Sequence, residues 1–115
     1  MPRIAKCRHV CAEPKYRLFK SDALLSEEIT LCVEELESIR LTDFEDLDQD
    51  VAAKRMSISR GTFQRILYSA RHKVAEALVT GKSILIDGGN YEVSTRSCQA
   101  NKRCKYCCFS EEMQD

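Results

Sequence analysis

The chain has 115 residues, of which 43% are hydrophobic, so it is long enough for one domain with a modest core and too apolar to be disordered along most of its length. Its apolar runs are far too short to span a membrane, and its N-terminus lacks the apolar segment of a secretory signal, so we expect a cytoplasmic protein with no membrane partner. The net charge is zero, but residues 1–20 carry six basic and one acidic residue, residues 21–50 one basic and eleven acidic, and residues 51–82 seven basic and one acidic. An anionic partner such as DNA would meet these local charges, unless the segments pair with each other or remain solvated.

The N-terminal residues 1–28 show no clear hydrophobic period. They hold both prolines, many basic residues and a cysteine pair, so we predict a basic arm of largely irregular structure. At its end, hydrophobic residues alternate for a few positions between Glu28 and Val33, which favours a short strand.

A first helix of about three turns is predicted over residues 33–44. The spacing of its apolar residues directs Leu36, Ile39 and Phe44 inward, and its first turn is acidic, as suits the positive end of a helix dipole. Cys32 stands at the N-cap, with Glu35 three residues later. Ser or Thr at position 32 would complete a capping box with Glu35.

Two further helices are predicted, over about residues 48–56 with Asp48 as cap and over about residues 60–80 with Gly81 as the C-terminal stop. The last helix carries an apolar stripe at three- and four-residue steps: Phe63, Ile66, Leu67, Ala70, Val74 and Leu78. At about twenty residues it is long for so small a domain. We therefore expect its far half to carry the next element or a partner.

Residues 83–94 are predicted to form a β-hairpin, because two short apolar runs flank Gly88-Gly89. Two strands alone are marginal, so the hairpin should pack on the last helix or accept the strand near Ile29 and Leu31. Residues 95–115 form a polar, cysteine-rich tail. The expected fold is mainly α: a three-helix helix-turn-helix domain over residues 29–82 with a small β-hairpin and irregular cysteine-rich ends.

The helix-turn-helix prediction rests on residues 49–67. Ala53 supplies the small residue needed where the two helices cross, Met56 and Ile58 flank the turn, and Phe63 and Ile66 anchor the second helix. The turn usually holds a glycine with positive φ. Ser57 occupies that place here, at an expected cost of about 1 kcal/mol.

A helix-turn-helix predicts which residues meet DNA, because the second helix enters the major groove by its N-terminal residues. Arginine and glutamine can read base edges, while hydroxyl groups near a helix N-terminus suit phosphate oxygens. The predicted base- or phosphate-contacting residues are Ser59, Arg60, Thr62, Gln64 and Arg65, with Lys54, Arg55, Arg71 and Lys73 attracting the phosphate backbone. The alternative is a three-helix domain that uses the same packing for protein contacts and leaves these charges solvated.

Six of the seven cysteines lie near the two ends of the chain, which is typical of a metal or redox site. Cys104 and Cys107 form a Cys-x-x-Cys pair, and together with Cys7 and Cys11 they could supply four thiolates to one ion. The substitute ligands are Cys98, Cys108 and His9. We expect zinc, with an iron–sulfur cluster, a thiol switch at Cys107-Cys108, or a tail of unpaired cysteines as alternatives.

A series of short motifs runs in order through the chain: Met1-Pro2-Arg3, Lys6-Cys7-Arg8, Leu31-x-Val33-x-Glu35-Leu36-Glu37-x-Ile39-Arg40-Leu41-x-Asp43, Ala52-Ala53, Met56, Ser59-Arg60-x-Thr62-Phe63, Arg65-Ile66-Leu67, Ala70-Arg71-x-Lys73-Val74-Ala75-x-Ala77-Leu78 and Gly81-Lys82. With these motifs, residues 1–90 resemble a prokaryotic domain-of-unknown-function family of small predicted DNA-binding proteins, whose centre is similar to region four of sigma factors. The resemblance implies a bacterial or archaeal transcription regulator. Some members of that family are associated with domains of the iron–molybdenum cofactor biosynthesis class, which implies proteins of iron–sulfur or metal-cofactor assembly as partners. Cys32 and Ser57 depart from the threonine and glycine of the family pattern.

The sequence therefore predicts a sequence-specific double-stranded DNA-binding regulator of transcription with a cysteine-ligated metal site. Because many such readers pair half-sites, a homodimer is expected. No phosphate loop, nucleotide fingerprint or nucleophile motif is present in the sequence, so we expect no enzyme. The alternatives are a metal- or redox-responsive protein-interaction module without DNA binding and, third, a thiol oxidoreductase.

Overall fold

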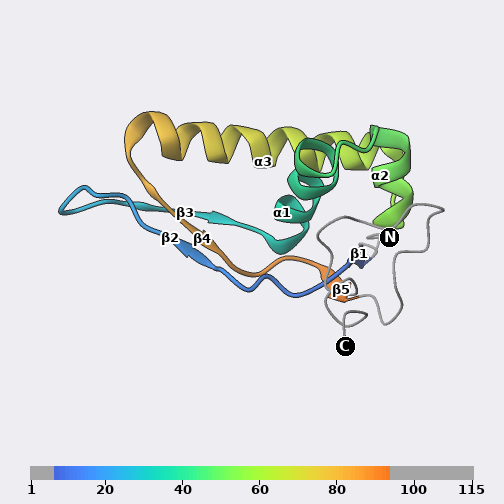
Figure 1. Cartoon of the computed structure of the whole chain (residues 1–115), viewed down its shortest axis with the longest axis horizontal. Coiled ribbons are helices and arrows are strands. Elements are labelled where there is room, and N and C mark those ends of the chain that lie inside the picture. The colour runs from blue at the N-terminus through green and yellow to red at the C-terminus, as the bar shows by residue number, and fades with distance from the viewer. Residues whose placement is uncertain (1–6, 94–115) are drawn as a thin grey trace, which may run out of the picture.

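The computed structural model describes residues 7–93. In chain order its elements are β1 (Arg8–Val10), β2 (Leu18–Phe19), β3 (Glu28–Leu31), α1 (Val33–Ile39) continued by the π-helical turn η1 (Arg40–Phe44), α2 (Gln49–Arg55), α3 (Arg60–Thr80), β4 (Ser83–Ile86) and β5 (Tyr91–Val93) (Figure 1). The three predicted helices are confirmed. Two small sheets accompany them, so the fold combines α and β structure rather than being mainly α.

Helix α1 begins where it was predicted and changes pitch before its end. Glu35 accepts a hydrogen bond from the backbone N–H of Cys32 at 2.9 Å, which is the reciprocal half of a capping box. In η1 the backbone N–H of Glu45 bonds to the carbonyl of Arg40, five residues back, at 2.8 Å. This wider turn shifts the phase of the helix. Phe44 is therefore 53% exposed, contrary to the predicted inward position, and Glu45 is buried instead.

Helices α2 and α3 have the predicted bounds and caps. The Asp48 carboxylate accepts from the backbone N–H of Val51 at 2.9 Å, and α3 ends at Gly81, whose φ is 77°. The predicted inward stripe of α3 is wrong at its last residue, because Leu78 is 76% exposed. Ala77 is the last buried residue of α3, and Leu78 follows it about 100° further around the helix.

The predicted hairpin over residues 83–94 is wrong, because β4 and β5 belong to different sheets. β4 lies between β2, its antiparallel neighbour, and β3, which runs parallel to it with Ile29 opposite Ile84. The expected pairing with the strand near Ile29 and Leu31 is thus confirmed. β5 pairs in parallel with β1. Within residues 7–28 the chain adds the short strands β1 and β2 and is otherwise largely irregular, as predicted.

The segment between β4 and β5 crosses the start of α1 instead of reversing direction. The backbone N–H of Val33 donates to the carbonyl of Gly88 at 3.1 Å, and that of Asn90 donates to the Glu34 carboxylate at 3.1 Å. Gly89 has a φ of 112°, and a Cβ there would lie 2.0 Å from Oε1 of Glu34. Glycine is needed here for a close approach, not for a hairpin turn.

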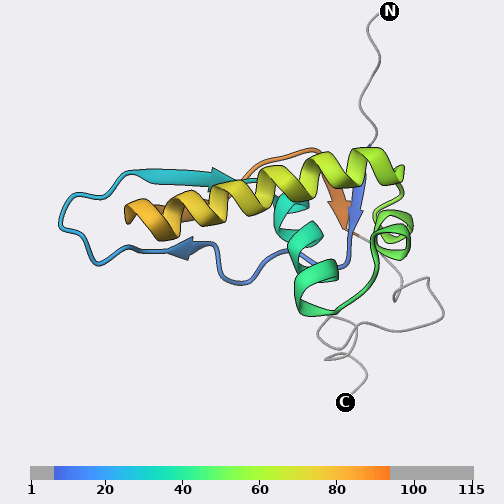
Figure 2. The ribbon, with the colours of Figure 1, turned by 90° about the horizontal axis from the view of Figure 1, so that it is seen from above.

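Helix α3 spans both halves of the core. The three-stranded sheet lies beneath its C-terminal half, and α1, α2 and the β1–β5 pair lie beneath its N-terminal half (Figures 1 and 2). One buried cluster joins α2 to α3 and contains Cys11, Leu41, Ala52, Ala53, Met56, Phe63 and Leu67. A second joins the sheets to α1 and α3 and contains Val10, Leu31, Val33, Ala70 and Ile86. Among the described residues, no helix is long and apolar enough to cross a membrane.

Candidate nucleic-acid interface

The connection between α2 and α3 is a short turn held by buried residues. Ala53, Met56 and Phe63 are at most 2% exposed, as their predicted roles at the helix crossing require. The backbone N–H of Ile58 donates to the carbonyl of Ala53 at 3.0 Å. Ser57 has a φ of 60°, which confirms the predicted left-handed turn residue. These contacts fix the direction in which α3 leaves the turn.

The N-terminus of α3 is exposed and lined by hydroxyl groups. Ser59 caps the helix by accepting from the backbone N–H of Thr62 at 3.2 Å, and its own hydroxyl donates to Oγ1 of Thr62 at 3.0 Å. Arg65 donates from Nη2 to the same oxygen at 3.2 Å. Three of the residues predicted to contact DNA are therefore joined in one chain of hydrogen bonds. Together with the helix dipole, the Arg65 charge makes this end of α3 electropositive.

Among the basic residues predicted to bind DNA, some form ion pairs with carboxylates and others form none within the described chain. Arg60 lies 3.4 Å from the exposed Asp50 carboxylate, and Arg71 binds Asp43 at 2.7 Å. The hydrogen bond to Asp43 raises the pKa of the Arg71 guanidinium, so its charge is permanent but matched by a carboxylate. Lys54 and Arg65 are exposed, and neither forms an ion pair within residues 7–93. Gln64 and Arg55 are half-buried.

Lys73 belongs to a buried polar group that joins α3 to α1. Its Nζ lies 2.8 Å from Oε1 of Glu35, whose side chain is 8% exposed. Glu35 also accepts from Oγ of Ser69 at 2.6 Å and from the backbone N–H of Cys32. Burial alone would raise the pKa of Glu35, but these donors outweigh burial and hold the pKa below its ordinary value. The ammonium group of Lys73 is therefore already bound inside the protein.

A pocket of about 340 Å³ lies between β1 and the first half of α3, and sequence reasoning did not find it. Its lining residues are Arg8, Cys32, Glu34, Glu35, Thr62, Arg65, Ile66 and Ser69. Burial, followed by the nearby Glu35 and Glu34 charges, raises the pKa of the Cys32 thiol, so this thiol stays protonated at neutral pH. Arg8 and Arg65 come from distant parts of the sequence, so no local motif could have connected them.

The predicted metal ligands are only partly within the described chain. Cys7 is exposed, with its thiol directed to Oδ1 of Asn90 at 3.3 Å, whereas Cys11 is buried in the core. The two cysteines lie on either side of strand β1, and the described residues contain no group of three or more side chains that could hold a metal ion. Nε2 of His9 lies 2.6 Å from the Glu92 carboxylate. Cys98, Cys104, Cys107 and Cys108 lie outside the described residues, and the metal centre stays a prediction.

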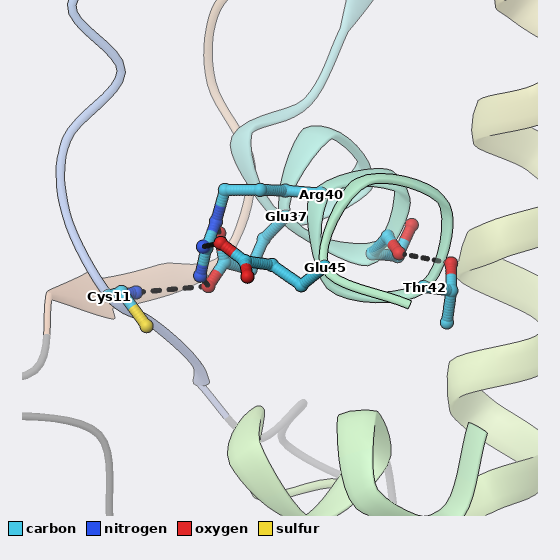
Figure 3. Close-up of polar contacts among 6 residues, drawn as sticks. Cys11, Glu37, Arg40, Thr42 and Glu45 are labelled. Carbon is cyan, nitrogen blue, oxygen red and sulfur yellow. Dashed lines mark hydrogen bonds and ion pairs between the residues drawn. The ribbon is translucent and has the colours of Figure 1, made fainter. Parts of the chain in front are cut away.

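Cys11 is held by a buried cluster of charged groups (Figure 3). Its backbone N–H donates to Oε2 of Glu37 at 3.1 Å. Arg40 lies between two carboxylates, at 2.8 Å from Glu37 and 3.3 Å from Glu45. All three side chains are largely buried, at 18%, 7% and 2% exposed. The cluster anchors the end of β1 to η1 and so fixes β1 beside the α2–α3 turn.

The chain matches the family model described as "Protein of unknown function DUF134" over residues 1–94. A "UPF0251 protein" of Ruminiclostridium cellulolyticum is 52% identical over 99 residues, covering 85% of this chain and 78% of that relative. One of Caldicellulosiruptor saccharolyticus is 46% identical over 110 residues, covering 96% and 73%, and one of Thermoanaerobacter pseudethanolicus is 52% identical over 96 residues, covering 81% of each. No solved structure matches the chain. The chain therefore belongs to the DUF134 family, whose members carry the name UPF0251.

Proposed function

We propose that this protein binds double-stranded DNA through a helix-turn-helix formed by α2 and α3 and regulates transcription. The supporting observation is the α2–α3 pair itself. Its short turn has Ser57 in a left-handed conformation, and buried Ala53, Met56 and Phe63 hold the two helices together. This packing leaves the hydroxyl-lined, basic N-terminus of α3 exposed, where a recognition helix would contact the major groove.

The contacts around α3 suggest a role for each residue. Arg65 is exposed and forms no ion pair among the described residues, so its planar fork is available for guanine or phosphate. Ser59 and Thr62 would bind phosphate at the helix N-terminus, and Lys54 would bind phosphate from α2. Arg60 can exchange its long, exposed ion pair with Asp50 for a phosphate at little cost. Arg71 and Lys73 would contribute less, because Asp43 and Glu35 already neutralise them.

The test is duplex binding with a selected and a random sequence. Duplexes enriched from a random pool would be titrated by fluorescence anisotropy at several salt concentrations. We expect tighter binding to the selected duplex, and an affinity that falls steeply with salt. Arg65→Ala should bind both duplexes more weakly, whereas Lys20→Ala, a matched loss of an exposed charge beside β2, should leave the affinity unchanged.

Two outcomes would decide against the proposal. Equal binding of Arg65→Ala and the parent to both duplexes would show that α3 does not read DNA. No binding at low salt would remove DNA binding altogether and would favour the alternative, a protein-interaction module that responds to a metal or to redox state.

The cysteine-bound metal is a separate proposal that rests on the sequence. Four of the six terminal cysteines lie in residues 94–115, outside the part of the chain that the structure describes. Elemental analysis and a visible spectrum of protein purified without oxygen would distinguish zinc from an iron–sulfur cluster. The double variant Cys104→Ser/Cys107→Ser should lose the metal if these thiolates bind it. Protein purified without any metal would refute the site.

A further inference from the structure

The pocket between β1 and α3 brings a second arginine to the proposed DNA-binding end of α3. β1 is fixed there by its backbone: the N–H of Arg8 donates to the carbonyl of Asn90 and the N–H of His9 to the carbonyl of Met56, both at 3.0 Å. The Met56 carbonyl belongs to the α2–α3 turn. Arg8 is thus held beside the turn, and its side chain lines the same pocket as Arg65.

The Arg8 guanidinium lies at the pocket with a buried donor that no described residue satisfies. Within residues 7–93 its Nε is buried without a hydrogen-bond partner, and its side chain forms no ion pair. A buried donor on a charged group is costly unless something accepts from it, and such groups in proteins nearly always have an acceptor. No residue in the described part of the chain supplies this acceptor, so a ligand that enters the pocket would supply it.

The acidic residues in the pocket do not supply that acceptor. Glu35 is neutralised by Lys73 and already accepts from Ser69 and Cys32. Glu34 accepts from the backbone N–H of Asn90. With Lys73 counted beside Arg8 and Arg65, the cations around the pocket exceed the two carboxylates by one charge. An anion is therefore the ligand that balances it.

We propose that this pocket binds a phosphate group, with Arg8 and Arg65 as its two guanidinium ligands. Two arginine forks match the oxygens of a phosphate in number and geometry, and Thr62 lines the same pocket with a hydroxyl that can donate as well. Resting on the proposed function, the phosphate is that of a DNA backbone next to the bases read by α3. Arg8 is then a further DNA-binding residue, contributed by a strand outside the helix-turn-helix.

The experiment compares the full chain with Arg8→Ala, Arg8→Lys and the control Lys20→Ala. Each would be titrated with duplex DNA at several salt concentrations, and separately with inorganic phosphate and a nucleoside monophosphate. We expect Arg8→Ala to bind duplex about tenfold more weakly on all sequences and to lose about 0.9 from the slope of log affinity against log salt. Arg8→Lys should recover the slope and only part of the affinity, because it keeps the charge without the fork.

The outcomes separate this proposal from DNA binding itself. Duplex binding with the parental salt slope in Arg8→Ala would overturn the pocket and leave the proposed function standing. Loss of binding to small phosphates in Arg8→Ala, in a chain that binds no duplex, would support the pocket and overturn DNA binding. Binding of neither ligand by the parent chain would overturn both. The Arg8 side chain loses no hydrogen bond or ion pair to another described residue, and thermal unfolding checks that Arg8→Ala is folded.

Discussion

Lys73→Met tests whether Lys73 is a structural cation rather than a DNA contact. In the parent protein its ammonium group lies 2.8 Å from Glu35, with 32% of the Lys73 side chain and 8% of the Glu35 side chain exposed. Methionine keeps most of the length of the lysine stem and removes only the charge. The variant therefore leaves a carboxylate buried between α1 and α3 without its cation.

The expected loss of stability is about 2 kcal/mol. Breaking a fully buried ion pair costs about 3–5 kcal/mol, because the remaining charge stays desolvated. The cost is smaller here, because Lys73 is one-third exposed and Ser69 and Cys32 still donate to Glu35; a hydrogen bond to a charged group contributes about 1.5–3 kcal/mol. The matched control is Arg71→Met on the same helix. It breaks the exposed pair with Asp43 and should cost less than about 1 kcal/mol.

Urea unfolding of both variants at several pH values provides the measurement. The pKa of Glu35 is held below its ordinary value of 4.5, so the ion pair stabilises the fold fully above about pH 4.5 and is lost as pH falls through the lower folded-state pKa. The difference between the parent and Lys73→Met should therefore be constant near neutral pH and shrink below pH 4.5. Equal losses of unfolding free energy for Lys73→Met and Arg71→Met at neutral pH would refute a structural role for the ion pair between Lys73 and Glu35.

Three further substitutions test the fold. Ser57→Gly should raise stability by about 1 kcal/mol, because residue 57 has a φ of 60°; a lower urea midpoint would contradict the turn. Gly89→Ala should cost at least about 1–3 kcal/mol, since its Cβ would meet Glu34 at 2.0 Å, and an unchanged thermal midpoint would contradict the crossing over α1. Leu67→Ala should cost about 2–5 kcal/mol and Leu78→Ala about 0.5 kcal/mol or less, because only Leu67 is in the core. Similar losses of stability for the two variants would indicate that Leu78 is buried, as the sequence predicted.

Helix predictions succeeded where caps and period agreed. Asp48 and Gly81 mark helix ends by chemistry that acts within a few residues, and the Ser57 conformation follows from the turn. The predicted inward position of Phe44 was wrong because a π-helical turn changes the phase on which a 3.6-residue period depends. The bond that closes this turn is a single backbone contact, and nothing in the local composition signals it.

The strand predictions failed for a different reason. The apolar runs of β4 and β5 and the intervening glycines are the pattern of a hairpin, and the pairing is decided by distant partners: β2 and β3 for one strand, β1 for the other. Gly89 is required by Glu34, which is remote in the sequence. The candidate site divides in the same way. Arg65 was predictable from its helix, whereas Arg8 reaches the pocket only through long-range pairing.

Some of the basic residues predicted to bind DNA form ion pairs with carboxylates in the folded chain. The number that remains available predicts the salt dependence of DNA binding. Six basic side chains were predicted on the DNA-binding surface, which would give a slope of log affinity against log salt of about −5. The fold commits Arg71 and Lys73 to carboxylates, and Arg55 is half-buried. Lys54, Arg65 and Arg8 form no ion pair within the described chain, and Arg60 can exchange its exposed pair with Asp50, so four cations are available to phosphate at the proposed surface.

Four phosphate contacts give a slope of about −3.6, so affinity should fall about 150-fold between about 50 and 200 mM salt; six contacts would lower it by more than about 1000-fold. A measured slope near −5 would mean that Arg71 and Lys73 leave their carboxylates for DNA. It would then contradict the inference that Asp43 and Glu35 keep these two cations from DNA. A slope near −3.6 that falls to about −2.7 in Arg65→Ala would support four phosphate contacts, because each lost contact removes about 0.9 from the slope.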